Sequence, residues 1–148
     1  MKMIRKITLV ALAATISSLV WAAQNEVELA KLQGEWSMVS GSADGQQMPE
    51  EMRKEMKRVC RGDVTTTTLG ARTFLKAKIT IDPSKKPKTI DYEMLDGFTK
   101  GKKQLGIYEV DGDRFKSCFG KPDGERPTEF ATKPGDGRTL SVWKRDKR

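Results

Sequence analysis

Apolar and polar side chains alternate along most of the chain from about residue 59 to residue 142. The clearest stretch covers residues 75–81, where Leu, Ala and Ile alternate with Lys and Thr. Alternation with a period of two is typical of a β-strand with one buried and one exposed face. The pattern predicts eight or nine short strands, among them residues 35–40, 64–69, 75–81, 90–94, 105–110, 114–119, 128–130 and 140–142, and the period of two begins near residue 59.

Tight turns join these strands in sequence order. Asp111-Gly112-Asp113 lies between two apolar runs and predicts a hairpin, because both central residues of such a turn need positive φ. A series of hairpins forms an antiparallel meander, and closing it removes the exposed edges. We therefore predict an all-β fold, a small antiparallel up-and-down barrel. A sandwich of two sheets is the alternative.

Two helices are predicted beside the strands. Residues 27–33 carry enough spaced apolar side chains for one or two helical turns near the N-terminus. Residues 49–57 predict a helix between the first and second strands, since Pro suits a first turn and Glu50 precedes Lys54 by four positions. Met48, Met52 and Met56 would line one face of this helix.

The first 22 residues have the build of an export signal. Lys2, Arg5 and Lys6 precede an apolar stretch at residues 7–20, and Ala22 ends a cleavage-type sequence. The stretch is too short and too rich in Ala, Ser and Thr for a membrane span. We predict a signal peptide at 1–22 and one domain at 23–148, exported to the periplasm or the extracellular space. An uncleaved amphipathic anchor is the alternative.

The charge and the residue types narrow the function. The chain has 28 Lys and Arg against 20 Asp and Glu, with a net charge of +8. Basic clusters could attract anionic envelope polymers or serve solubility alone, and they lack the interleaved aromatic residues of a nucleic-acid platform. The chain has no histidine, which excludes His-based catalytic triads and His-containing zinc sites. We expect no catalytic residues, metal or cofactor, and therefore no enzyme.

Cys60 and Cys118 are the only cysteines. An exported protein can keep a disulfide, so this pair is a candidate bridge. If the two residues occupy distant strands or opposite faces of the barrel, they are buried free thiols instead.

Four segments carry a resemblance to a known family: residues 32–36, 82–91, 105–113 and 125–130. With them the chain resembles a lipocalin-like domain family common in planctomycete bacteria, whose members have no established function. The resemblance implies a lipocalin-like barrel. Gly34 and Trp36 also look like the lipocalin signature, in which the Trp closes the narrow end of the barrel. The same likeness implies that a basic residue of the last strand, here Arg145, lies across its ring.

We expect the protein to be a monomer whose function is to bind a ligand or a partner protein. The Met-lined helix and the barrel mouth would hold a small apolar or amphipathic ligand, among inward side chains that include Tyr92 and Tyr108. Alternatively, the domain binds a protein, as an inhibitor or an envelope assembly partner, through charged loops at residues 85–87 and 121–126. Arg126 and Glu129 could orient a ligand at the rim, but a structural ion pair that pins their loop is favoured.

Overall fold

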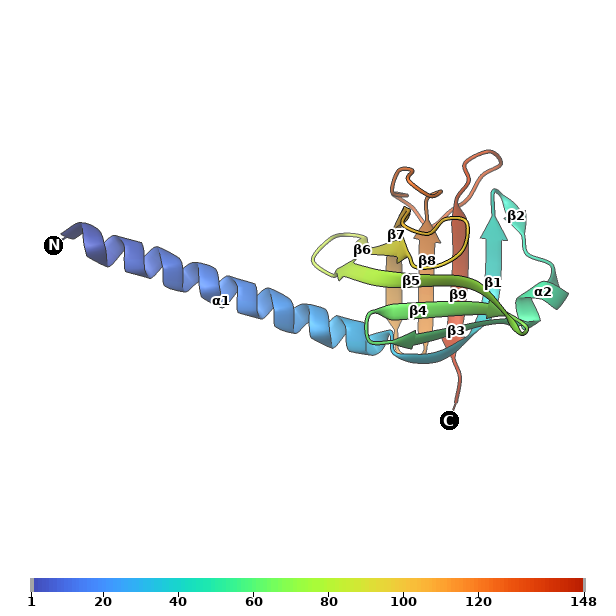
Figure 1. Ribbon diagram of the computed structural model, residues 1–148, viewed down its shortest axis with the longest axis horizontal. Coiled ribbons are helices and arrows are strands. Elements are labelled where there is room, and N and C mark those ends of the chain that lie inside the picture. Colours follow the sequence, from blue (N-terminus) through green and yellow to red (C-terminus); the bar gives the residue numbers. More distant parts are fainter. Residues whose placement is uncertain (1, 148) are drawn as a thin grey trace.

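The computed structural model describes the backbone of residues 2–147 and the side chains of residues 17–147. The strands form one antiparallel sheet (Figure 1). The elements in order are α1 (Lys2–Lys31), β1 (Gly34–Ala43), β2 (Gln46–Gln47), α2 (Glu50–Lys54), β3 (Met56–Arg61), β4 (Val64–Leu69), β5 (Arg72–Asp82), β6 (Lys88–Met94), β7 (Lys103–Asp111), β8 (Arg114–Phe119) and β9 (Thr139–Arg145).

The sheet closes into a barrel of eight strands. From β3 to β9 each strand pairs with the next, and β1 pairs with both β3 and β9. Trp36 marks the closure, because it lies opposite Arg58 on one side and Arg145 on the other. The two-residue β2 is an extra strand on the end of β1. The predicted up-and-down barrel is thus confirmed, and the sandwich alternative is excluded.

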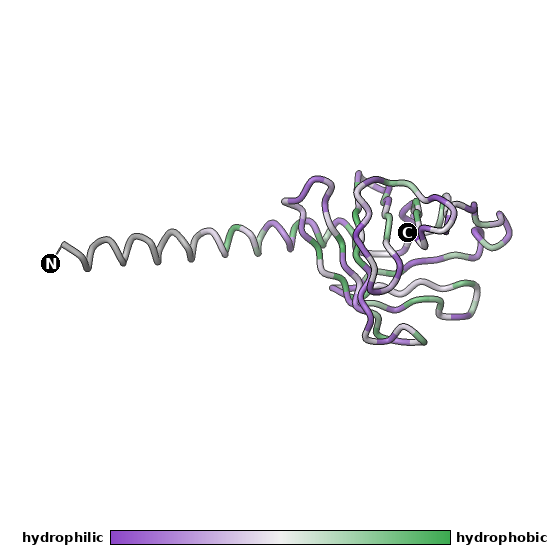
Figure 2. Tube along the Cα trace, turned by 90° about the horizontal axis from the view of Figure 1, so that it is seen from above, coloured by the Kyte–Doolittle hydropathy of each residue, from purple (hydrophilic) through white to green (hydrophobic). Residues whose placement is uncertain are grey.

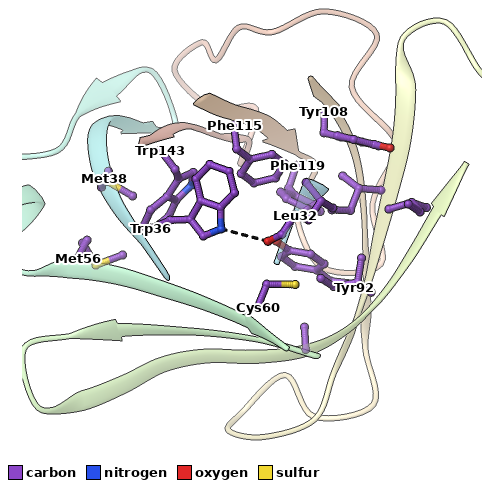
Figure 3. Close-up of a cluster of buried hydrophobic side chains, with 14 of the residues drawn as sticks. Leu32, Trp36, Met38, Met56, Cys60, Tyr92, Tyr108, Phe115, Phe119 and Trp143 are labelled. Atoms are coloured by element: carbon purple, nitrogen blue, oxygen red, sulfur yellow. Dashed lines mark hydrogen bonds between the residues drawn. The ribbon is translucent and has the colours of Figure 1, made fainter. Parts of the chain in front are cut away.

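Side chains at alternate strand positions point into the barrel and form its packed core. Figure 2 shows apolar and polar residues alternating along the strands. Trp36, Tyr108 and Phe115 are fully buried, and the Trp36 and Phe115 ring centroids lie 5.9 Å apart (Figure 3). Ile79, Ile81, Tyr92 and Phe119 are also buried in the core, with Leu75 partly buried against them.

One end of the barrel is closed by the last turns of α1. Leu32 is fully buried there, and Trp36 Nε1 donates a hydrogen bond to its carbonyl oxygen over 3.1 Å (Figure 3). The Arg145 guanidinium carbon lies 4.2 Å from the Trp36 ring centroid, and this side chain also donates to the carbonyls of Gln33 and Lys31. This is the arrangement that the resemblance to lipocalins implies for Trp36 and Arg145.

The helix that makes this contact is longer than predicted. Residues 27–31 are the end of α1, which begins at Lys2 and extends away from the barrel in Figure 1. The predicted cleavage point after Ala22 lies within it. Met1 and the side chains of residues 2–16, which belong to the predicted signal segment, lie outside the described part. Within the described residues, no helix has the length and apolar character needed to cross a bilayer.

The predicted helix over residues 49–57 is wrong at its C-terminal end. The helix α2 covers only Glu50–Lys54, and Met56 already belongs to β3, opposite Leu69 of β4. A spacing of four fits a strand period of two as well as a helix period of 3.6, so the methionine pattern did not distinguish them. Strand pairing prevails at Met56 because it gives backbone partners and buries the side chain to 3% exposure.

The predicted strand at residues 128–130 is also wrong. These residues belong to an irregular segment between β8 and β9. Pro127 is buried, whereas Phe130 is only half-buried, with Lys116 Nζ 4.3 Å from its ring centroid. Because β8 already pairs with β7 and β9, the closed sheet has no free edge for another strand here.

Candidate ligand-binding pocket

A cavity of about 370 Å³ opens at the barrel end opposite α1. This mouth is where β1 ends and where β3 and β5 begin, beside α2. A volume of this size is near the lower limit for pockets that bind small molecules, which usually hold about 300–1,000 Å³.

The upper wall of the cavity is apolar. Met56 and Met94 are buried on β3 and β6, and Met48 reaches the cavity from the chain between β2 and α2. Phe74 stands at the rim with 63% of its surface exposed, at the point where the β4–β5 register shifts. Flexible methionine side chains adapt to ligands of varied shape.

The floor of the cavity is polar and holds a buried cation. Arg58 is 1% exposed and points inward from β3 between Met56 and Cys60, which share its face of the strand. Its Nε donates to Thr65 Oγ1 over 2.9 Å, and its Nη2 donates to the Tyr92 hydroxyl over 3.4 Å. Its guanidinium carbon lies 4.3 Å from the Phe115 ring centroid, within the range of a cation–π contact.

Two serines complete the floor. Ser117 and Ser141 lie opposite each other on β8 and β9, with their hydroxyl oxygens 3.1 Å apart. Trp143 Nε1 donates to the Ser141 hydroxyl oxygen over 2.9 Å. Tyr92 stacks near Phe119, with ring centroids 4.2 Å apart, and burial raises the pKa of its hydroxyl. Tyr92 therefore stays a neutral phenol, able to donate as well as to accept.

The structure brings together three of the five residues expected to contact a ligand. Met48, Met56 and Tyr92 line the cavity. Met52 is 42% exposed and borders a shallow depression outside it. Tyr108 lies toward the closed end, where its hydroxyl donates to Glu28 over 3.2 Å.

Arg126 and Glu129 do not form the predicted ion pair. Arg126 Nη1 instead contacts Asp91 Oδ1 at 2.5 Å and donates to the Gly106 carbonyl over 2.7 Å, on the outer wall of the barrel. Glu129 is exposed in the irregular segment. The Arg126 contact does pin its loop, but to β6 and β7 rather than to a residue of the same loop.

The two cysteines are free and buried. Cys60 points into the barrel core, whereas Cys118 lies on the other face of β8 and contacts the Ala131 carbonyl of the irregular segment. Opposite faces of the sheet cannot be bridged without moving the backbone. The candidate disulfide is therefore absent, and the alternative of two buried thiols holds.

The sequence interpretation missed Arg58, Ser117 and Ser141, and of these Arg58 could have been detected. A period-two pattern over residues 56–60 assigns Arg58 to the same inward face as Met56 and Cys60, but the predicted helix over residues 49–57 concealed it. The detectable signal was a charged residue at a strand position where the alternation otherwise places apolar, inward-facing side chains.

No arrangement of three or more His, Cys, Asp or Glu side chains that could hold a metal ion occurs in the part of the chain that the structure describes. The candidate site is thus built from Arg, Tyr, Ser and apolar side chains.

Comparisons with protein-family models, with curated proteins and with solved structures found no match to this chain.

Proposed function

We propose that this chain is an exported, non-catalytic, lipocalin-like domain that binds a small apolar or amphipathic molecule at the barrel mouth. The observation that carries this proposal is the cavity of about 370 Å³ with its methionine wall. A barrel whose only role was structural would gain stability by filling that space, because unfilled volume in a core is destabilising.

The test combines copurification and added ligand. Mass spectrometry of an organic extract is expected to reveal a bound lipid-like species. After removal of that species, a long-chain alcohol at about 100 times its Kd should stabilise the fold by about 2.7 kcal/mol, seen as a rise in Tm.

Two variants give this test its control. Leu75→Trp places bulk in the cavity and should reduce the ligand-induced rise in Tm. Val39→Trp adds the same ring at an exposed position of β1 and should leave the rise unchanged. An empty extract together with no rise in Tm for any apolar ligand would contradict the proposal.

A protein-binding module is the second candidate. One observation favours it: Lys85 and Lys86 border the same groove on the outer wall as Arg126, although these residues belong to different loops. Charge reversal at both lysines should then abolish capture of an envelope protein that the unmodified domain retains. If the unmodified domain retains no partner across a range of salt, this candidate fails.

A further inference from the structure

Arg58 carries a charge that the surrounding protein does not neutralise. It is 1% exposed, and none of the ion pairs among residues 17–147 involves it. Its two hydrogen-bond partners, Thr65 and Tyr92, are neutral, and its Nη1 has no partner among the described residues. Burying an unpaired charge is costly, and a guanidinium keeps its charge in proteins.

Other polar groups that line the same cavity add further donors. In the Trp143–Ser141–Ser117 chain, the indole N–H and one hydroxyl proton make the two hydrogen bonds, so the second hydroxyl proton remains available. The Tyr92 oxygen accepts from Arg58, which leaves its own O–H to donate. The floor therefore offers several donors and one full positive charge.

The charges of the cavity are separated by depth. Asp96 is the acidic residue of the lining, and it lies exposed at the mouth, whereas Arg58 lies buried below the methionine wall. A ligand that matches both regions has an anionic head and an apolar tail. The planar fork of an arginine suits a carboxylate, and hydrogen bonds between charged groups are the stronger kind.

We propose that the cavity binds an amphipathic monocarboxylic acid with its carboxylate at Arg58 Nη1 and its tail directed to the mouth. This inference rests on the proposed ligand-binding function and names the ligand class of the same cavity. The volume of about 370 Å³ limits the occupant to one tail of moderate length, with the methionines around it.

The Tm of an Arg58→Met variant distinguishes a ligand-binding role of Arg58 from a purely structural one. Because Arg58 is buried without a counter-charge, replacing it with an apolar residue of similar size removes the cost of burying that charge. The Arg58→Met variant should therefore fold, with a Tm equal to or above that of the unmodified protein without ligand. A residue kept only for packing would instead lower the Tm when replaced.

The experiment compares two probes of equal chain length, dodecanoate and dodecanol, by calorimetric titration of the delipidated full chain. We expect dodecanoate to bind about 10- to 100-fold more tightly than dodecanol, the range set by a hydrogen bond to a charged group. Arg58→Met should remove this preference and leave dodecanol affinity within about threefold. Arg61→Met removes a guanidinium from the exposed face of the same strand and should keep the preference.

Each remaining outcome has one meaning. Equal affinity of the unmodified protein for the two probes overturns the carboxylate proposal and leaves apolar ligand binding intact. Binding of neither probe overturns both. A preference for dodecanoate that survives Arg58→Met overturns the role of Arg58. The comparison of the two probes on the unmodified protein needs no variant, so the ligand class is decided even if Arg58→Met does not fold.

Discussion

Two buried charged side chains at different depths of the barrel have opposite surroundings. Glu28 of α1 is 5% exposed and contacts Lys88 Nζ at 2.7 Å and Lys31 Nζ at 2.9 Å. Arg58, by contrast, contacts only neutral groups. A buried charge with cationic partners stabilises the closed end, whereas a buried charge without a partner is available to a ligand.

Glu28 makes stability depend on pH. Burial acts to raise the pKa of Glu28, but hydrogen bonds from Lys88 and Lys31, with their charges, outweigh it and hold the pKa below its ordinary value. The unfolded chain thus binds the proton more readily, so this contribution is present at neutral pH and is lost as the pH falls below about 4. Glu28→Gln should cost about 1–3 kcal/mol at pH 7, with a difference in Tm that shrinks in acid.

Glu26→Gln serves as the control for that prediction. Glu26 lies exposed on the same helix, so its replacement should leave the Tm unchanged. A Glu28→Gln difference that is constant from pH 7 to pH 3 would contradict the role assigned to these hydrogen bonds.

At the scale of elements, the important boundary lies between α2 and β3. Glu55 ends α2 after five residues, and from Met56 onward alternate side chains enter the barrel. This change of period places Arg58 on the inward face, so the short helix is a condition for the polar floor of the cavity.

Two methionines distinguish this boundary from a continuous helix. Met56→Ala should lower the free energy of unfolding by about 2–4 kcal/mol, because its side chain is 3% exposed in the core. Met52→Ala should change it by less than about 0.5 kcal/mol, because Met52 is 42% exposed. Denaturant titration measures both. Equal losses of unfolding free energy in the two variants would support a continuous helix with both methionines on one face and would refute the strand assignment at Met56.

At the scale of the whole molecule, closure of the sheet creates an inner and an outer face with separate contents. The inner face holds the aromatic core, the cavity and Cys60, whereas Cys118 lies under the irregular segment on the outside. The outer groove with Arg126 is therefore separated from the cavity by the barrel wall.

The separation of the two faces makes a redox prediction. Protein recovered under oxidising conditions should retain two thiols by intact mass, and its Tm should not change when a reductant is added. Burial raises the pKa of both Cys60 and Cys118, so a thiol reagent should modify the native protein slowly and the denatured protein fully. An intact mass lower by two hydrogens would overturn the assignment to opposite faces.

The sequence pattern alone determined the all-β class and most of the strands, and the resemblance to lipocalins implied the contact between Trp36 and Arg145. Period-two alternation and Asp-Gly turns are local properties, so they can be detected without knowledge of the partner strands. For the same reason the local pattern failed where two periods coincide, at Met56, and where a strand-like segment had no edge to join, at residues 128–130.

Only the tertiary structure decided the candidate site. The cavity exists because strands far apart in sequence bring Arg58, Tyr92 and Ser117 to one floor, and no local pattern encodes that distance. Tertiary packing also determined that Arg126 pairs with Asp91 and that Cys60 and Cys118 face opposite sides. Side-chain alternation specifies which residues share a face of the sheet, whereas barrel closure specifies which of them meet across its interior.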